Sequence, residues 1–161
     1  MKKISISILA IIFCAFFSSA TFAQTTSFQD VTEQDWFYDY VTLLSERFFV
    51  SGVNNNEFMP NDDITRAEFV KILANVSQID FSQYTGITDF YDVNYESWYA
   101  KPVQWAYDSQ IVQGMGNNFF APNKKITREE AAVILGRHVN TIDEFQLPNP
   151  KEKMHFKDES N

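Results

Sequence analysis

Cysteine and basic residues are scarce in this 161-residue chain. Its one cysteine, Cys14, permits no disulfide bond within the chain and no cysteine-based metal site. Thirteen Lys and Arg residues face 21 Asp and Glu residues, which gives a net charge of −8. Because neutralising phosphates requires clustered cations, this balance argues against nucleic acid as a partner. The 16 Phe, 7 Tyr and 3 Trp residues instead indicate a chain able to form a packed core.

Long apolar runs are also lacking, apart from one at the N-terminus. Lys2 and Lys3 precede an apolar run from Ile4 to Phe17, and small residues then lead to Ala23. This order is typical of a secretory signal peptide, and the run is shorter than the roughly 20 apolar residues that cross a membrane. We therefore expect residues 1–23 to be removed. The exported chain would have no cysteine, no transmembrane span and a net charge of −10, since Lys2 and Lys3 leave and all 21 acidic residues stay.

Motifs of common enzyme sites are missing as well. The sequence contains no nucleophile elbow, no glycine-rich phosphate loop and no zinc-ligand spacing. Its two histidines, His138 and His155, have no Cys or His partners in metal register. We expect a protein that is not an enzyme, with no catalytic residue, no metal site and no cofactor.

What the chain does contain is an internal repeat. A shift of about 62 residues aligns residues 28–76 with residues 90–138 without a gap, and about 18 of the roughly 49 aligned positions are identical. A Pro-containing linker follows, and Phe156-Lys157-Asp158 restarts the Phe-x-Asp opening of each unit. We expect a first repeat with linker at 24–89, a second repeat at 90–140, and a linker with the start of an incomplete third repeat at 141–161.

Each unit is predicted to form a helix, a loop and a second helix, so we expect an all-α fold of tandem helix-loop-helix repeats. Apolar residues recur at helical spacing from Trp36 and from Trp98, with Asp35 and Ser97 as expected caps. Gly, Asn and Pro then mark a loop in each copy, in which Phe58 or Phe120 is expected to pack on the core. Since one helix pair cannot bury its apolar face alone, we expect neighbouring units to share a core.

The second helix of each unit begins with a capping box. Thr65 with Glu68, and Thr127 with Glu130, have the spacing at which the hydroxyl accepts from the third backbone N–H while the carboxylate accepts from the cap. Helix capping alone therefore accounts for these four residues, and no ligand-binding role is needed to explain them.

Capping does not explain the arginine that follows the cap in both copies. Arg66 and Arg128 place a cation where the helix terminus is already partly positive, which is mildly unfavourable. A guanidinium beside free backbone N–H groups forms a compact site for a carboxylate or phosphate. The alternative is a surface arginine paired with a nearby carboxylate.

These motifs together resemble the S-layer homology family. The resemblance covers residues 27 to 140 and includes the Phe-x-Asp-Val openings, the tryptophan six residues after each Asp, the Phe-x-Pro loops and the Ile-Thr-Arg-x-Glu helix starts. It implies a secreted module of the bacterial cell envelope that anchors proteins by binding an anionic, pyruvylated secondary cell wall polysaccharide. It also implies three repeats assembled as a pseudo-threefold helical prism, with ligand grooves between repeats.

The resemblance assigns ligand contact to Arg66 and Arg128, with Trp36 and Trp98 as candidates for stacking on sugar rings. For both tryptophans, the alternative is packing in the core, because they lie on the apolar stripe. Two units do not close such a prism, so either a longer parent chain or association with a second chain would complete it.

The alternative function is a calcium-dependent helical interaction module of the dockerin type. It is prompted by the loop residues Asn54, Asn55, Asn56, Asp62 and Asp63, although their spacing does not match a calcium loop.

Overall fold

The computed structural model describes residues 28–54 and 56–142, and in these ranges the regular structure is helical. The α-helices are α2 (Tyr38–Glu46), α3 (Arg66–Val76), α4 (Ala100–Asp108) and α5 (Arg128–Asn140), with a short 3-10 helix, η2 (Phe81–Gln83), between α3 and α4. The described residues form no strand and only two isolated bridges. The all-α prediction is therefore confirmed for this part of the chain. The expected signal peptide and the Phe156-Lys157-Asp158 segment lie outside the described residues.

The first helix of each repeat starts later than the sequence suggested, and the expected caps are wrong. Phe37 precedes α2 and Tyr99 precedes α4, and neither helix start has a side-chain cap. The Asp35 carboxylate accepts hydrogen bonds from the backbone N–H and the hydroxyl of Thr32 instead. A short turn precedes each helix. In this turn the backbone carbonyls of Asp35 and Ser97 accept hydrogen bonds from the N–H groups of Tyr38 and Ala100.

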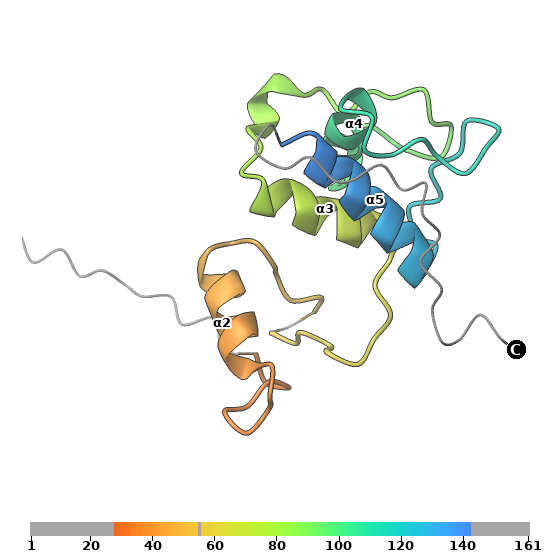
Figure 1. The fold of residues 1–161 in the computed structure, drawn as a ribbon. Coiled ribbons are helices and arrows are strands. Elements are labelled where there is room, and N and C mark those ends of the chain that lie inside the picture. The colour runs from red at the N-terminus through yellow and green to blue at the C-terminus, as the bar shows by residue number, and fades with distance from the viewer. Residues whose placement is uncertain (1–27, 55, 143–161) are drawn as a thin grey trace, which may run out of the picture.

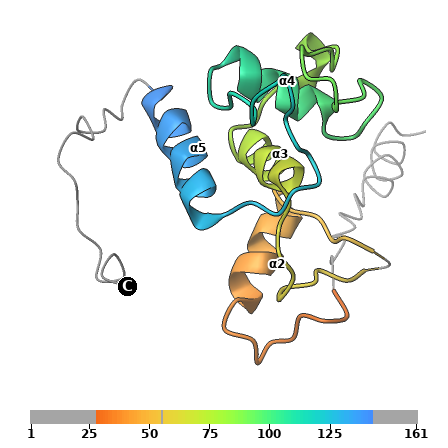
Figure 2. The same ribbon diagram turned by 90° about the vertical axis from the view of Figure 1, so that its right-hand side faces the viewer.

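The main packing between helices crosses the boundary between repeats. Helix α3, from the first repeat, packs against α4, from the second. Figures 1 and 2 show α3, α4 and α5 grouped together, with α2 and its loop at one end of the molecule. The core comes from both repeats: it includes Val70 and Ala74 from α3, Val103 and Ala106 from α4, and Ile134 from α5. The expectation that neighbouring units share a core is confirmed.

The Phe-x-Asp opening of each repeat holds the loop that follows the first helix. The Asp30 carboxylate accepts hydrogen bonds from the backbone N–H groups of Phe58 and Met59, at 2.8 and 2.7 Å. Asp92 binds the equivalent loop of the second repeat at the same distances. Loop phenylalanines also pack on the opening phenylalanines, with ring centroids 5.3 Å apart in the first repeat and 5.6 Å apart in the second. The repeated motif is therefore a structural clamp.

Two glycines are required by this clamp. A Cβ added to Gly114 would lie 2.6 Å from the Phe90 ring and 2.8 Å from the Phe119 carbonyl oxygen. At Gly52, a Cβ would lie 2.7 Å from the Phe28 ring and 2.6 Å from the Glu57 carbonyl oxygen. Both contacts are far closer than van der Waals distance, so the opening phenylalanine can pack only over a residue without a side chain.

Candidate functional site: the helix starts at the junction between repeats

Both predicted capping boxes are present. The Thr65 side chain accepts from the Glu68 N–H, and the Glu68 carboxylate accepts from the Thr65 N–H at 2.7 Å. Thr127 and Glu130 form the same reciprocal pair at the start of α5. These bonds fix the direction of the first turn and therefore the position at which each following arginine leaves the helix.

At the start of α3, the backbone binds the loop of the second repeat. The N–H groups of Arg66 and Ala67 donate to the carbonyl oxygens of Lys124 and Pro122, at 2.9 and 3.1 Å. In return, the Ile126 N–H donates to a carbonyl of the first repeat. Two of the N–H groups that a helix start leaves without partners are thus used to join the repeats.

Arg66 lies inside this junction. It is only 4% exposed, and its Nε donates to the Phe120 carbonyl oxygen at 3.0 Å. Its guanidinium carbon lies 5.0 Å from the centre of the Phe120 ring, and its Nη1 lies 3.7 Å from a Glu130 carboxylate oxygen. The structure therefore places Arg66 between the repeats, where most of its side chain is held by protein groups.

Charge around Arg66 is partly balanced. Burial lowers the pKa of Arg66, and the carboxylates of Glu130 and Asp92 raise it in part. The pKa of Glu130 is lowered, first by its hydrogen bond from Lys124 Nζ at 2.7 Å, then by the Thr127 N–H. Since Lys124 shares Glu130 with Arg66, the junction holds two cations against one close carboxylate. In the part of the chain that the structure describes, Nη2 of Arg66 has no hydrogen-bond partner, so it is the nitrogen of this guanidinium that could donate to an anion.

Arg128 stands in a different environment at the equivalent position of α5. It is exposed, and no hydrogen bond or ion pair to it occurs in the described part of the chain. The backbone N–H groups of Arg128 and Glu129 likewise have no partner among the described residues, in contrast to those of Arg66 and Ala67. Within the described ranges, the start of α5 therefore has one cation and two backbone N–H donors without a partner.

Trp36 and Trp98 are both outside the core. Trp36 is 87% exposed and Trp98 is 59% exposed, so the core-packing interpretation is wrong for each. Each indole meets the next aromatic residue edge-on, Trp36 with Phe37 and Trp98 with Tyr99. Trp98 keeps this exposure although α4 is packed against α3. Its open face is thus compatible with stacking on a flat ligand.

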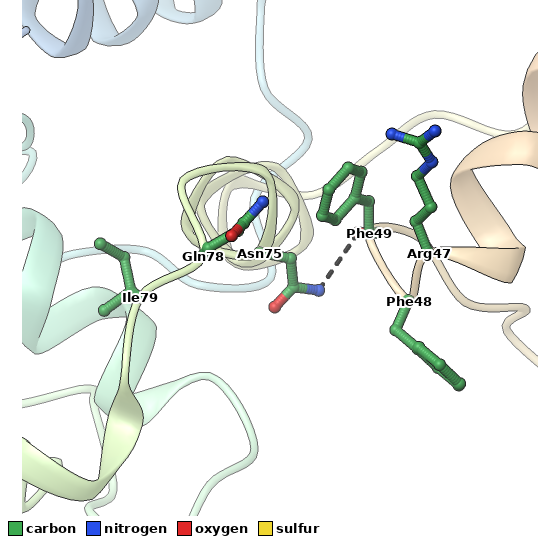
Figure 3. A pocket seen from close by; sticks show the side chains of 6 residues that line it. All are labelled: Arg47, Phe48, Phe49, Asn75, Gln78 and Ile79. Atoms are coloured by element: carbon green, nitrogen blue, oxygen red, sulfur yellow. Dashed lines mark hydrogen bonds between the residues drawn. The ribbon is translucent and has the colours of Figure 1, made fainter.

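A cavity of about 530 Å³ lies elsewhere, between the end of α2 and the end of α3 in the first repeat. It contains none of the four residues predicted to bind ligand; Figure 3 shows its lining residues, Arg47, Phe48, Phe49, Asn75, Gln78 and Ile79. The Asn75 side chain donates to the Phe49 carbonyl oxygen at 3.1 Å and ties the two helix ends together.

None of the residues that line this cavity is among the predicted site residues. Phe48 is 80% exposed and has a φ of 59°, a left-handed conformation that costs a bulky residue about 1–2 kcal/mol. Neighbouring Arg47 is exposed and has no ion pair within the described ranges. The sequence carried one signal for this cavity, a phenylalanine at a helix end where glycine is the usual choice.

Among residues 28–54 and 56–142, no group of three His, Cys, Asp or Glu side chains could hold a metal ion. Within the same ranges, no helix is both long and apolar enough to cross a membrane.

Comparisons with known proteins identify the family. The S-layer homology domain matches residues 27–70 and 89–132, one match for each repeat. Among similar proteins, endo-1,4-beta-xylanase A of Thermoanaerobacterium saccharolyticum is 36% identical over 112 residues, which is 70% of this chain and 9% of the xylanase. An amylopullulanase of Thermoanaerobacterium thermosulfurigenes is 32% identical over 130 residues, 81% of this chain and 7% of that protein.

Surface-layer proteins match as well. The surface-layer 125 kDa protein of Lysinibacillus sphaericus is 28% identical over 121 residues, 73% of this chain and 10% of that protein. The chain thus spans about a tenth of the length of these relatives. What enzymes and surface-layer proteins share with it is the repeated helical module, which is an anchoring domain and not a catalytic one. The chain therefore belongs to the S-layer homology family and is an anchoring module of the bacterial cell surface.

Proposed function

We propose that this module attaches to the cell wall by binding an anionic secondary cell wall polysaccharide, most specifically one that carries pyruvyl groups. A pyruvyl group adds a carboxylate to a sugar ring, so its recognition needs a hydrogen-bonding cation beside a surface for the ring. Binding would be non-catalytic and would take place where repeats meet.

The observation that carries this proposal is the free guanidinium of Arg128. In a chain with 21 acidic and 13 basic residues, most described cations are already engaged: Lys124 pairs with Glu130, Lys125 and Lys101 donate to backbone carbonyls, and Arg137 donates to Gln113. Arg128 has no such partner among the described residues, and the same holds for the two N–H groups beside it at the positive end of α5. A carboxylate would satisfy all three donors.

Arg66 has the same position in its motif and a second role. Its Nε and its ring contact hold the Phe120 loop, so it shapes the junction, while Nη2 remains for the ligand. Trp36 and Trp98 supply exposed indoles to stack on sugar rings. Family membership favours this function over the calcium-dependent alternative.

A third unit would complete the pseudo-threefold prism. Leu73 on α3 is 7% exposed in its contact with the second repeat, whereas the equivalent Leu135 on α5 is 43% exposed. On the α4 side of the same interface, Trp105 is 5% exposed, whereas the equivalent Leu43 on α2 is 45% exposed. The buried α3–α4 interface thus has two uncovered counterparts, one on α5 and one on α2. We propose that a third repeat, in a longer parent chain or in a second chain, covers both.

Co-sedimentation with purified cell walls tests the proposed function. Walls that retain the polymer should pellet the mature protein, and walls chemically stripped of the polymer should not. Arg128→Ala should reduce pelleting at least tenfold, and the control Lys101→Ala removes one exposed cation from α4 and should change little. Equal pelleting of wild type by stripped and intact walls would refute polymer binding.

A further inference from the structure

His138 joins the two repeats at the end of the junction away from Arg66. It lies near the C-terminus of α5, and its Nε2 is 3.0 Å from the hydroxyl of Ser77, the residue that follows α3. Its ring meets the Trp105 ring of α4 edge-on, with centroids 5.8 Å apart. One side chain of α5 therefore contacts two other helices, the end of α3 in the first repeat and α4 in the second.

The hydrogen bonds around Ser77 fix the proton on the His138 ring. The Ser77 hydroxyl donates its single hydrogen to the Leu73 carbonyl oxygen at 2.8 Å. With that hydrogen committed, the hydroxyl accepts in its contact with His138, and we assign the ring hydrogen to Nε2 on this ground. Nδ1 is then the unprotonated nitrogen. It is buried and has no hydrogen-bond partner among the described residues.

We propose that His138 is a pH-sensitive lock between the two repeats: the neutral ring holds α3, α4 and α5 together, and protonation at Nδ1 releases them. Protonation would create a charged N–H donor facing buried space that offers it no acceptor. Such a group costs substantially more than a buried lone pair, because a charge loses far more hydration on burial. Release of the Ser77 contact and exposure of the ring to water remove that cost.

The groups that pack on His138 do not compensate a positive charge. Ser77 from α3 and Trp105 from α4 are neutral. Of the charged residues on or next to these elements, Asp80 binds Ser82, Lys71 lies over the Phe81 ring, Lys101 donates to the Phe81 carbonyl oxygen and Arg137 donates to Gln113. No ion pair within the described ranges includes His138. Burial alone lowers the pKa of His138, with no opposing contribution from a carboxylate.

The lowered pKa of His138 sets the direction in which folding stability changes with pH. The unfolded chain takes up the proton near the ordinary histidine pKa of about 6.5, before the folded chain does. The stability that His138 contributes is complete above that pH and is lost as the pH falls toward the lower pKa of the folded state. Carboxylates titrate mostly below about pH 4.5, so a window near pH 5 to 6.5 isolates the histidine.

Urea unfolding of the full chain between pH 7.5 and 5.0, followed by tryptophan fluorescence, tests the lock. The wild-type folding constant should fall below pH 6.5 with a slope of up to tenfold per pH unit, the limit for one proton. His138→Gln keeps a neutral donor for Ser77 and should remove that slope. The matched control is His155→Gln, which removes the other histidine and should leave the slope unchanged. Equal slopes in wild type and His138→Gln would overturn the proposal.

Nitrogen-15 NMR of the wild-type histidine rings gives a second test that needs no variant to fold. At pH 7.5 one ring should be the tautomer with hydrogen on Nε2, and it should titrate below the ordinary range. Loss of hydrogen-exchange protection at the ends of α3 and α5 should accompany that titration. A His138 ring with hydrogen on Nδ1, or one that titrates without any loss of protection, would contradict the lock.

Discussion

At the residue scale, the same motif position has two different environments. Arg66 and Arg128 follow identical caps, yet Arg66 is 4% exposed and Arg128 is exposed. The difference arises because the second repeat supplies the Phe120 loop to Arg66, and no equivalent loop reaches Arg128 in the described part of the chain. The sequence motif therefore singled out both arginines, but it could not show that one of them is an internal contact.

Removing the Arg66 side chain should destabilise the fold. Arg66→Ala would leave the buried Phe120 carbonyl oxygen without its donor and a gap over the Phe120 ring, at a cost of about 2 kcal/mol. Urea unfolding measures this change. Arg128→Ala, the matched exposed arginine, should cost less than about 0.5 kcal/mol. If both variants were as stable as wild type, the structural role of Arg66 would be wrong.

Asp30 should contribute to acid sensitivity. The N–H groups of Phe58 and Met59 lower its pKa, outweighing a partial increase from burial. The stability from this lowering is present above the ordinary Asp pKa of about 3.9 and is lost as the pH falls below it. Between pH 5 and 3, Asp30→Asn should therefore show a shallower loss of stability than wild type. The control Asp62→Asn removes an exposed carboxylate that accepts no hydrogen bond within the described residues, and it should follow the wild-type curve. A wild-type slope in Asp30→Asn would contradict the loop clamp.

At the element scale, local rules succeeded where the responsible groups lie close in sequence. The starts of α3 and α5 were predicted correctly because a capping box is formed by residues three apart. The starts of α2 and α4 were not, because Asp35 bonds to Thr32 in the preceding turn and neither helix has a side-chain cap. Local patterns also could not show that Trp36 and Trp98 lie outside the core, because helical spacing defines a stripe without saying what covers it.

The equivalent leucines on α3 and α5 should respond differently to charge. Leu73→Glu would bury a carboxylate in the α3–α4 core and should destabilise the chain by at least about 3 kcal/mol. Leu135→Glu, at a position 43% exposed, should change stability by less than about 1 kcal/mol. Thermal and urea unfolding measure both. A large loss in Leu135→Glu would mean that the α5 face is already covered in this chain.

Glycine at position 114 should be indispensable to its loop. Gly114→Ala introduces a Cβ at 2.6 Å from the Phe90 ring at a φ of 75°, so both a clash and backbone strain result. Gly116→Ala has a φ of 98° but meets nothing within 4 Å, so it carries the strain alone. Gly114→Ala should therefore lower the melting temperature further than Gly116→Ala. Equal losses would show that the opening phenylalanine is free to move away.

At the scale of the whole molecule, the repeat predicted the architecture but not its packing partners. Self-similarity indicated helical units that share a core, and the core does join residues of both repeats. Which helices meet depends on geometry that a single repeat does not contain: α3 packs on α4 of the next unit, while α2 and α5 keep apolar faces uncovered. The proposed binding site likewise depends on contacts between repeats, since its residues lie at helix starts that neighbouring units complete.

Titration of the mature protein with purified wall polymer, with and without its pyruvyl groups, tests the central claim most directly. We expect saturable binding to the pyruvylated polymer, at least tenfold weaker binding after the pyruvyl groups are removed, and a similar loss in Arg128→Ala with its unfolding curve unchanged. Equal affinity for both polymers, together with wild-type affinity in Arg128→Ala, would contradict recognition of an anionic polysaccharide by this module.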